Sequence, residues 1–162
     1  MAAEVAYSER HKTPLSIILF DLDHFKKVND SHGHLAGDVV LRVVAAQVQK
    51  TIRTEDVLAR YGGEEFVILV RGIPHPNSAR FAERVRKAVE RLSIPWEQIQ
   101  IRATISIGVS SLSELPEPAS GDVLLHLADE RLYRAKAGGR NRVVSVWGIC
   151  STLPNISLDP AK

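Results

Sequence analysis

The sequence predicts a mixed α/β (α+β) domain, in which helices flank a central, mainly antiparallel sheet of about five strands. Apolar runs of strand length alternate along the chain with segments whose apolar residues recur every three or four positions. The first six of these segments follow the order βαββαβ, a split βαβ unit typical of ferredoxin-like folds. The length of 162 residues is that of one ordinary domain with its own hydrophobic core.

The composition excludes several classes of protein. Hydrophobic residues make up 44% and charged residues 25%, as in soluble globular proteins, and no apolar run approaches the roughly 20 residues of a membrane helix. A net charge of +2 is too small to predict a nucleic-acid partner. The single cysteine, Cys150, excludes an internal disulfide and a cysteine metal cluster, and it fits a reduced, cytoplasmic setting.

The first half of the chain is predicted to contain a helix, a buried strand and a second helix. Met1 to Lys12 has the composition of a short helix, which Thr13-Pro14 would end because proline disfavours helical geometry in the preceding residue. Leu15 to Phe20 is almost continuously apolar, as expected for a central strand covered on both faces. After a turn from Asp23 to Asn29, an amphipathic helix is expected to begin at Gly37-Asp38.

The second half is predicted to begin with a hairpin, because two glycines separate the strand-like runs Val57 to Tyr61 and Phe66 to Val70. Gly62 and Gly63 permit the positive backbone angles of a tight two-residue turn. Residues 1–146 are expected to form one domain, and Trp147 to Lys162 an irregular tail. The remaining predicted elements are a helix from Asn77 or Ser78, a half-polar strand over Ile99 to Ile107, a surface loop over Ser110 to Gly121, a helix over Asp122 to Ala137 and a strand over Val143 to Val146.

Acidic residues follow both the first strand and the hairpin turn. Carboxylates placed where a buried strand emerges, as Asp21 and Asp23 are, commonly hold a hard cation such as Mg²⁺. Asp23 is equally suited to cap the turn that follows it. Glu64 and Glu65 would point to opposite faces of a strand, so one of them can face a ligand, although solvated turn acids are the common alternative. The topology predicts that Asp21 and Glu64 converge.

Two further polar groups lie between the first strand and the second helix. Asp38 suits either an N-cap or an acceptor for donors of a base or ribose. His32 and His34 are two residues apart around a glycine, with no nearby cysteine or third histidine, which is a poor arrangement for zinc.

Many separate blocks of the sequence resemble the GGDEF family of diguanylate cyclases. The blocks are Phe20 to Asp30, Gly33-His34, Gly37-Asp38, Arg60 to Phe66, Ile105 to Val109, Ala128-Asp129, Leu132-Tyr133, Ala135-Lys136 and Gly139 to Asn141. They occur in the family's order over roughly Leu15 to Val146, which makes the match far more specific than a single short motif. The resemblance implies a palm-like fold similar to nucleotide cyclases and polymerases. It also implies condensation of two GTP molecules to cyclic di-GMP with release of two pyrophosphates.

The resemblance also assigns roles to individual residues of the reaction centre. Asp21, the Leu22 carbonyl and Glu64 would hold Mg²⁺, two ions per active site, with Mn²⁺ as an alternative. Glu64 is also the candidate base for the attacking 3′-hydroxyl, and Glu65 would assist the metals. Lys26 is implied as a second catalytic residue, which meets the phosphates where charge accumulates on transfer. The implied substrate-binding residues are Asn29 and Asp38 for the guanine edge, His34 near the nucleotide, and Lys136 and Arg140 for the β- and γ-phosphates. Backbone amides between Asp23 and Lys26 would add an anion cradle. Without the resemblance, Lys136 and Arg140 would be a basic helix end that complements the helix dipole.

A second site is implied by the segment from Arg53 to Asp56, which matches the family's RxxD inhibitory site. Cyclic di-GMP bound there would give product inhibition, with Arg84 completing the site from a neighbouring subunit. An Arg and an Asp at this spacing otherwise form a surface ion pair of little energetic consequence.

The sequence departs from the family pattern in two places. Glu64 replaces the Asp of the motif, an acidic variant that should preserve metal binding. The Asp-x-Leu-Thr segment that usually opens the domain is absent, so we expect a fragment of a larger protein with an upstream sensor or receiver domain. Each domain would hold one GTP, so catalysis requires a homodimer. The alternatives are a catalytically silent receptor for GTP or cyclic di-GMP, and another palm-type nucleotidyl transferase such as a mononucleotide cyclase or polymerase.

Overall fold

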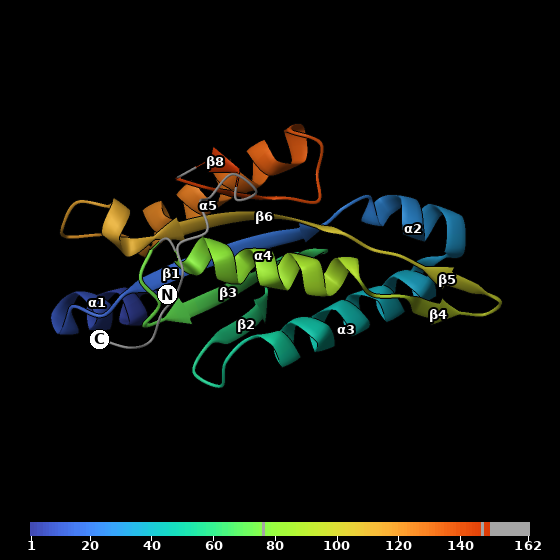
Figure 1. Ribbon diagram of the computed structural model, residues 1–162, viewed down its shortest axis with the longest axis horizontal. Coiled ribbons are helices and arrows are strands. Elements are labelled where there is room, and N and C mark those ends of the chain that lie inside the picture. The colour runs from blue at the N-terminus through green and yellow to red at the C-terminus, as the bar shows by residue number, and fades with distance from the viewer. Residues whose placement is uncertain (76, 147, 150–162) are drawn as a thin grey trace, which may run out of the picture.

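The computed structural model describes residues 1–75, 77–146 and 148–149 (Figure 1). The main sheet has six strands in the order β2-β3-β1-β6-β7-β8, and β4 and β5 form a separate two-stranded sheet. The strands are β1 (Leu15–Leu22), β2 (Val57–Arg60), β3 (Glu65–Arg71), β4 (Ile94–Trp96), β5 (Ile99–Ile101), β6 (Ile105–Ser111), β7 (Val143–Ser145) and β8 (Gly148–Ile149). Neighbouring strands of the main sheet are antiparallel except β6 and β7. The predicted fold class is therefore confirmed.

Helices cover both faces of the main sheet. They are α1 (Ala2–His11), α2 (Phe25–His32), α3 (His34–Thr51), α4 (Asn77–Glu90) and α5 (Gly121–Ala137), and a 3-10 turn, η1 (Leu112–Glu114), follows β6. Residues of α3 and α4 pack on one face of β1, β3 and β6 in the larger hydrophobic core. Residues of α5 pack on the other face, against Ile17 and Leu19. In Figure 1, α5 and the pair α3 and α4 accordingly lie on opposite sides of the sheet.

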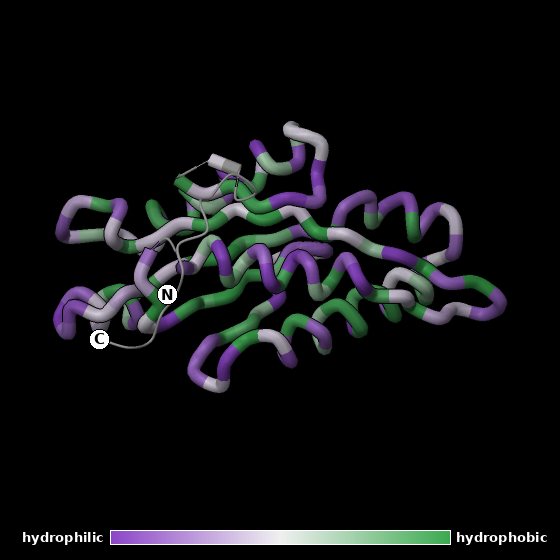
Figure 2. The backbone as a smooth tube through the Cα atoms, in the orientation of Figure 1, coloured by the Kyte–Doolittle hydropathy of each residue, from purple (hydrophilic) through white to green (hydrophobic). Residues whose placement is uncertain are grey.

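The centre of the sheet is β1, and all eight of its residues are buried. It lies between β3 and β6, with Phe20 opposite Phe66 and the two rings stacked at a centroid distance of 5.2 Å. Hydrophobic residues run along these central strands (Figure 2). The predicted central strand is confirmed, and it extends two residues further than predicted, so Asp21 is itself a strand residue.

The segment after β1 is more helical than predicted. A helix, α2, occupies most of the expected turn, and α3 begins at His34 instead of Gly37. Only Phe25 and Val28 of α2 pack against the core, so its apolar periodicity is too short to detect in a polar segment. Gly33, with a φ of 83°, separates the two helices.

The strand predicted over Ile99 to Ile107 is two strands in different sheets. Ile99–Ile101 forms β5 and pairs with β4, whereas β6 begins at Ile105 and enters the main sheet. All seven residues of β6 are buried, so the prediction of a half-polar strand is wrong for this part. Its serines are buried because they have internal partners: Ser106 Oγ donates to Asp23, and Ser110 Oγ donates to the Leu124 carbonyl.

Most other boundaries agree with the sequence prediction to within a residue or two, including those of α1, α4, α5 and β7. The predicted loop from Ser110 contains the end of β6 and η1. In the predicted tail, Gly148 and Ile149 form β8 beside β7, and residues 147 and 150–162 lie outside the described part. No helix in the described ranges is both long and apolar enough to cross a membrane.

Gly108 lets α5 pack closely on β6. A Cβ atom at this position would lie 2.0 Å from the Ala128 carbonyl oxygen and 2.5 Å from the Leu132 amide nitrogen. We therefore expect Gly108→Ala to lower the free energy of unfolding by about 2–3 kcal/mol, as overpacking of a core does. Chemical denaturation of Gly108→Ala and Gly63→Ala measures this. A Cβ atom on Gly63 meets no heavy atom within 4 Å, so Gly63→Ala should change stability by less than about 0.5 kcal/mol. Equal stability of the two variants would contradict the prediction.

Candidate active site

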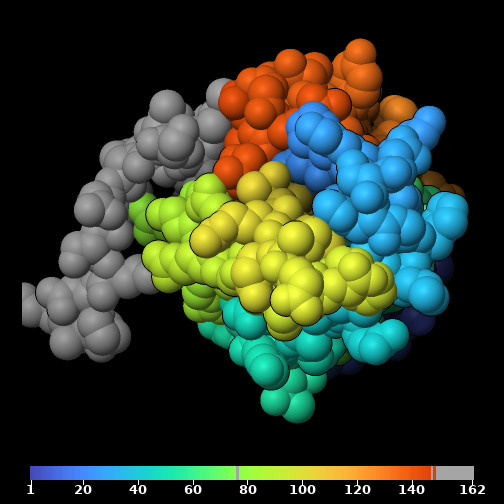
Figure 3. Space-filling view, turned by 90° about the vertical axis from the view of Figure 1, so that its right-hand side faces the viewer, coloured from blue at the N-terminus to red at the C-terminus, as the bar shows by residue number. Residues whose placement is uncertain are grey.

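The end of β1, the β2–β3 turn and the last turn of α5 meet at one end of the main sheet. Asp21 lies opposite Glu65 in the β1–β3 register, and the Leu22 amide donates a 3.4 Å hydrogen bond to the Glu64 carbonyl. The Lys136 Nζ atom lies 2.9 Å from the Asp21 Oδ2 atom. The blue surface around β1 and α2 meets the orange surface of the α5 region at this end (Figure 3). The predicted convergence of Asp21 and Glu64 is therefore confirmed.

The turn between β2 and β3 differs from the predicted two-residue turn. The Tyr61 and Gly62 amides both donate to the Glu65 carbonyl, at 2.8 and 3.2 Å, so the loop is longer by one residue. Gly62 and Gly63 do not adopt positive φ angles. Glu64 consequently lies in the loop and only Glu65 belongs to β3, so the predicted alternation of the two acids along a strand is wrong.

The Arg60 side chain fixes the shape of this longer loop. Its Nε atom donates to the carbonyls of Gly62 and Gly63, at 3.2 and 3.1 Å, and its Nη2 atom also donates to Gly63. These bonds satisfy carbonyl groups that the strand ladder does not use. The space beside Gly63 is open, which allows a ligand to approach the backbone. Arg60 thus holds the loop that carries Glu64. This role of Arg60 follows from the geometry of the loop.

The two carboxylates at this end lack full charge compensation. Asp21 is only 6% exposed, and burial raises the pKa of its carboxyl although Lys136 opposes this effect. Burial also raises the pKa of Glu64, and the nearby Asp21 charge adds to the effect. Arg140 contributes positive charge toward Asp21. The site therefore favours an additional cation beside Asp21 and Glu64.

The donor atoms at this position fit a hard divalent cation. Asp21 and Glu64 supply carboxylate oxygens, and Leu22, the residue after Asp21, supplies a carbonyl oxygen. The side chain of Glu65 lies close to Gly62, since a Cβ atom there would come within 2.8 Å of Glu65 Oε2. Within the described residues, no group of three His, Cys, Asp or Glu side chains forms a closed metal cluster. Such a donor set suits Mg²⁺, which retains waters and is completed by substrate phosphates.

The residues predicted to bind guanine lie on the two helices after β1. Asn29 packs beside Gly37, where a Cβ atom would lie 1.9 Å from Asn29 Oδ1. That oxygen is buried and has no hydrogen-bond partner among the described residues, so it is an unsatisfied acceptor. Asp38 is exposed in the second turn of α3, which rules out the N-cap role. His34 is exposed at the start of α3, and Lys26 is exposed in the first turn of α2.

Asp23 connects three segments instead of capping the turn that follows it. Its carboxylate accepts hydrogen bonds from Thr104 Oγ1 at 2.7 Å, Ser106 Oγ at 2.6 Å and the Asn141 amide at 3.0 Å. The N-cap of α2 is His24, whose side chain makes no capping bond. The sequence shows that Thr104 and Ser106 are polar residues at alternate positions, but it does not show that both bind Asp23.

Lys136 and Arg140 come from the last turn of α5 and the loop after it. The Arg140 amide donates to the Ala135 carbonyl at 3.0 Å, and Arg140 has a left-handed φ of 64°. Because Lys136 pairs with Asp21 on another element, its role is not limited to complementing the helix dipole.

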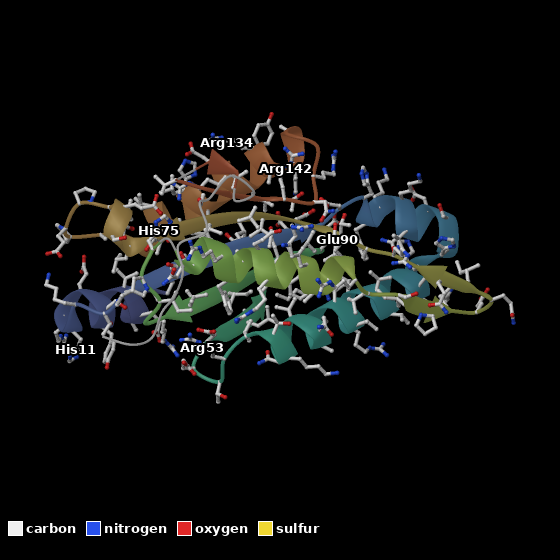
Figure 4. All side chains as sticks on the ribbon, viewed as in Figure 1. His11, Arg53, His75, Glu90, Arg134 and Arg142 are labelled. Atoms are coloured by element: carbon white, nitrogen blue, oxygen red, sulfur yellow. The ribbon has the colours of Figure 1, made fainter. Side chains whose placement is uncertain are left out.

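The predicted inhibitory residues lie elsewhere in the molecule. Arg53 follows the C-terminal end of α3, an 18-residue helix of about 27 Å that begins at His34. In Figure 4, Glu90 lies at the C-terminal end of α4, and Arg53 lies toward the other end of that helix. Arg53, Arg80 and Arg84 line one surface pocket with Gly72, Ile73, Pro74, Asn77 and Phe81. The Arg84 guanidinium lies 4.7 Å from the centre of the Phe81 ring.

Asp56 has a structural role beside this pocket. It is 5% exposed, and its carboxylate accepts hydrogen bonds from the amides of Arg53 at 3.0 Å and Arg71 at 3.3 Å. These bonds fix the turn that carries Arg53. The structure therefore brings the two predicted arginines together, and it places the Asp56 carboxylate among backbone amides.

Comparison with known proteins agrees with this geometry. The family model described as "Diguanylate cyclase, GGDEF domain" matches residues 1–142. The chain belongs to the GGDEF family. Diguanylate cyclase A of Treponema denticola is 44% identical over 136 residues, which cover 84% of this chain and 36% of that protein. The probable diguanylate cyclase DgcT of Escherichia coli is 43% identical over 142 residues, which cover 86% of this chain and 31% of that protein.

Solved GGDEF structures share the fold. The GGDEF domain of DgcB from Caulobacter crescentus, in complex with c-di-GMP, is 32% identical with a TM-score of 0.80, covering 86% of this chain and 82% of that one. The active GGEEF domain of a diguanylate cyclase from Vibrio cholerae is 34% identical with a TM-score of 0.81, covering 88% and 89%. The chain spans about a third of the length of the curated relatives it matches. GGDEF cyclases are generally metal-dependent, in agreement with the donor set at Asp21 and Glu64.

The raised pKa of Glu64 leads to a stability prediction. Because the folded state holds this proton more tightly than the unfolded state, the charged carboxylate lowers stability once the pH exceeds its usual pKa. Glu64→Gln should therefore raise the unfolding temperature at neutral pH in metal-free buffer by about 1–2 °C, a small effect because Glu64 is only partly buried. The gain should vanish below about pH 4, where the carboxyl is protonated in both states. Thermal denaturation across this pH range measures it, with Glu130→Gln, an exposed site on α5, as control. A lower unfolding temperature at neutral pH would contradict the prediction.

Proposed function

We propose that this domain is a diguanylate cyclase that condenses two GTP molecules to cyclic di-GMP and releases two pyrophosphates. The observation that carries the proposal is an incompletely compensated pair of carboxylates, the buried Asp21 and the half-buried Glu64, beside Lys136. Named diguanylate cyclases among the relatives support the same activity. GTP as substrate agrees with a cytoplasmic reaction.

Each part of the site has a task in this reaction. Asp21, Glu64 and the Leu22 carbonyl would hold Mg²⁺, with Glu65 nearby and Mn²⁺ as an alternative ion. When bound, the metal lowers the pKa of the attacking hydroxyl and neutralises charge on the phosphates. Glu64 lies in a loop where the space beside Gly63 is open to a ligand, and it accepts the 3′-hydroxyl proton as general base.

Basic and polar side chains around the carboxylates bind the nucleotide. Lys26, Lys136 and Arg140 bind the triphosphate, where charge accumulates as the α-phosphate is attacked. Asn29 Oδ1, an acceptor without a partner among the described residues, and the Asp38 carboxylate accept hydrogen bonds from the N1 and N2 donors of guanine, with His34 near the nucleotide. One domain binds one GTP, so the 3′-hydroxyl and the α-phosphate come from two copies, and a homodimer is required. A sensor or receiver domain of a longer protein would control that dimerisation.

A receptor for GTP or cyclic di-GMP that performs no chemistry is the second candidate. The pocket with Arg53, Arg80 and Arg84 favours an anionic ligand, and the DgcB domain was solved with c-di-GMP. In the cyclase, the same pocket would bind the product and inhibit the enzyme. In the receptor, it would be the principal site.

Turnover distinguishes these two candidates. Concentrated protein, and protein fused to a dimeric coiled coil, should form cyclic di-GMP from GTP and Mg²⁺, as measured by chromatography. Glu64→Gln should lower the rate at least about a hundredfold, because it removes a metal ligand and the base, while the fold remains intact by circular dichroism. No product from the fused dimer would exclude the cyclase and leave the receptor. A normal rate in Glu64→Gln would exclude Glu64 from both roles.

Product inhibition is expected to depend on the pocket lined by Arg53, Arg80 and Arg84, which we call the arginine pocket. Arg53→Ala and Arg84→Ala should each raise the cyclic di-GMP concentration for half-inhibition about tenfold, which is the effect of losing one charged hydrogen bond. Single arginine variants are preferable to a variant of Asp56, whose carboxylate holds the local backbone. Arg91→Ala, an exposed change just beyond α4, is the control. Unchanged inhibition in both pocket variants would show that Arg53 forms only its surface ion pair with Glu55.

A further inference from the structure

The loop after α5 has an uncommon backbone conformation. Gly139, Arg140 and Asn141 have φ angles of 112°, 64° and 46°, so three consecutive residues lie in the left-handed half of conformational space. Residues other than glycine rarely adopt such angles, although Asn tolerates them better than most. A conformation of this kind persists only when surrounding contacts impose it. The contacts that hold Asn141 therefore help to fix the loop that carries Arg140.

Asn141 is held at three atoms by two different parts of the fold. Its amide donates to Asp23 Oδ2 at 3.0 Å, at the end of β1. Its side-chain Oδ1 atom accepts from Arg86 Nη1 at 2.6 Å, and its Nδ2 atom donates to Glu90 Oε1 at 2.6 Å, so both polar atoms of the side chain bind α4.

Arg86 is itself fixed in place. It is 8% exposed, and Glu83 accepts hydrogen bonds from its Nε and Nη2 atoms at 2.9 and 2.8 Å. A planar guanidinium held at two positions presents its remaining nitrogen in one direction. That nitrogen, Nη1, binds Asn141 and also lies 3.1 Å from Glu90. The anchor on α4 is thus a rigid group formed by Glu83, Arg86 and Glu90.

We propose that Asn141 is a positioning residue, which holds Arg140 and the adjacent end of α5 in the orientation that binds the β- and γ-phosphates of GTP. The proposal rests on the function proposed above and adds a residue to which no role in the reaction has been assigned. Asn141 itself turns its polar atoms toward α4 and β1, so it acts through Arg140 and does not touch the substrate. The sequence does not reveal the contacts of Asn141 with α4, because Glu83, Arg86 and Glu90 are more than fifty residues away from Asn141 in the chain.

The proposal predicts that affinity is lost only for ligands that carry the β- and γ-phosphates. Asn141→Gly keeps the left-handed backbone accessible and removes both side-chain bonds. It should weaken binding of the α,β-methylene analogue of GTP about tenfold and change binding of GMP less than about twofold, both measured by calorimetry with Mg²⁺. In turnover, KM for GTP should rise more than kcat falls. A purely structural role would weaken both ligands equally or lower only the unfolding temperature.

A reciprocal exchange tests the link to α4 directly. Asn141→Asp alone loses the donor to Glu90 and places two carboxylates together, so triphosphate binding should fall at least about tenfold. In the double variant Asn141→Asp with Glu90→Gln, the introduced amide can donate to the introduced carboxylate, and the summed charge is that of the wild type. Triphosphate affinity should return to within about threefold of the wild type. Glu130→Gln is the matched control at an exposed glutamate of α5.

The outcomes separate this proposal from the function on which it rests. Analogue binding by the wild type without any turnover would reject the cyclase and still allow the Asn141 variants to be compared. Failure of the wild type to bind the analogue would overturn both proposals. Equal losses for the analogue and GMP in Asn141→Gly, or no recovery in a folded double variant, would overturn the positioning role alone.

Discussion

The burial of the Asp21 carboxylate at the end of β1 is the constraint on which the rest of the site depends. A carboxylate taken out of water in the centre of a sheet is costly unless opposite charge lies close to it. Lys136 supplies part of that charge from α5, and Glu64, on the facing loop, adds to the negative charge. The remaining imbalance supports the proposal that this site binds a cation and the phosphates that accompany it. The end of β1, the β2–β3 loop and the end of α5 must therefore meet at this point.

Three features bring those elements together. Gly108 allows α5 to approach β6, which places Lys136 within reach of Asp21. Arg60 holds the glycine loop in the form that carries Glu64. Asp23 joins the end of β1 to β6 and to the loop after α5 through three hydrogen bonds. Internal polar contacts of this kind give a site its precision, because each buried polar group has a specific partner.

The two faces of α4 connect different parts of the molecule. Arg80, Phe81 and Arg84 line the arginine pocket, whereas Glu83, Arg86 and Glu90 contact the loop that carries Arg140. The same helix also contributes to the larger hydrophobic core, so both sets of side chains are mounted on one rigid element.

The sequence by itself determined the order of the elements, the central buried strand, the helix boundaries with clear periodicity and the family to which the chain belongs. These properties depend on local composition and on residues close in the chain, as in Leu15 to Phe20 or the hairpin motif. The tertiary structure decided the rest. The start of α3, the break between β5 and β6, the three-residue loop at Glu64 and the partners of Asp23, Asp56 and Asn141 depend on groups that lie far apart in the sequence. A side chain's partner is set by packing in three dimensions, and a periodic pattern shows which residues are buried without showing what they touch.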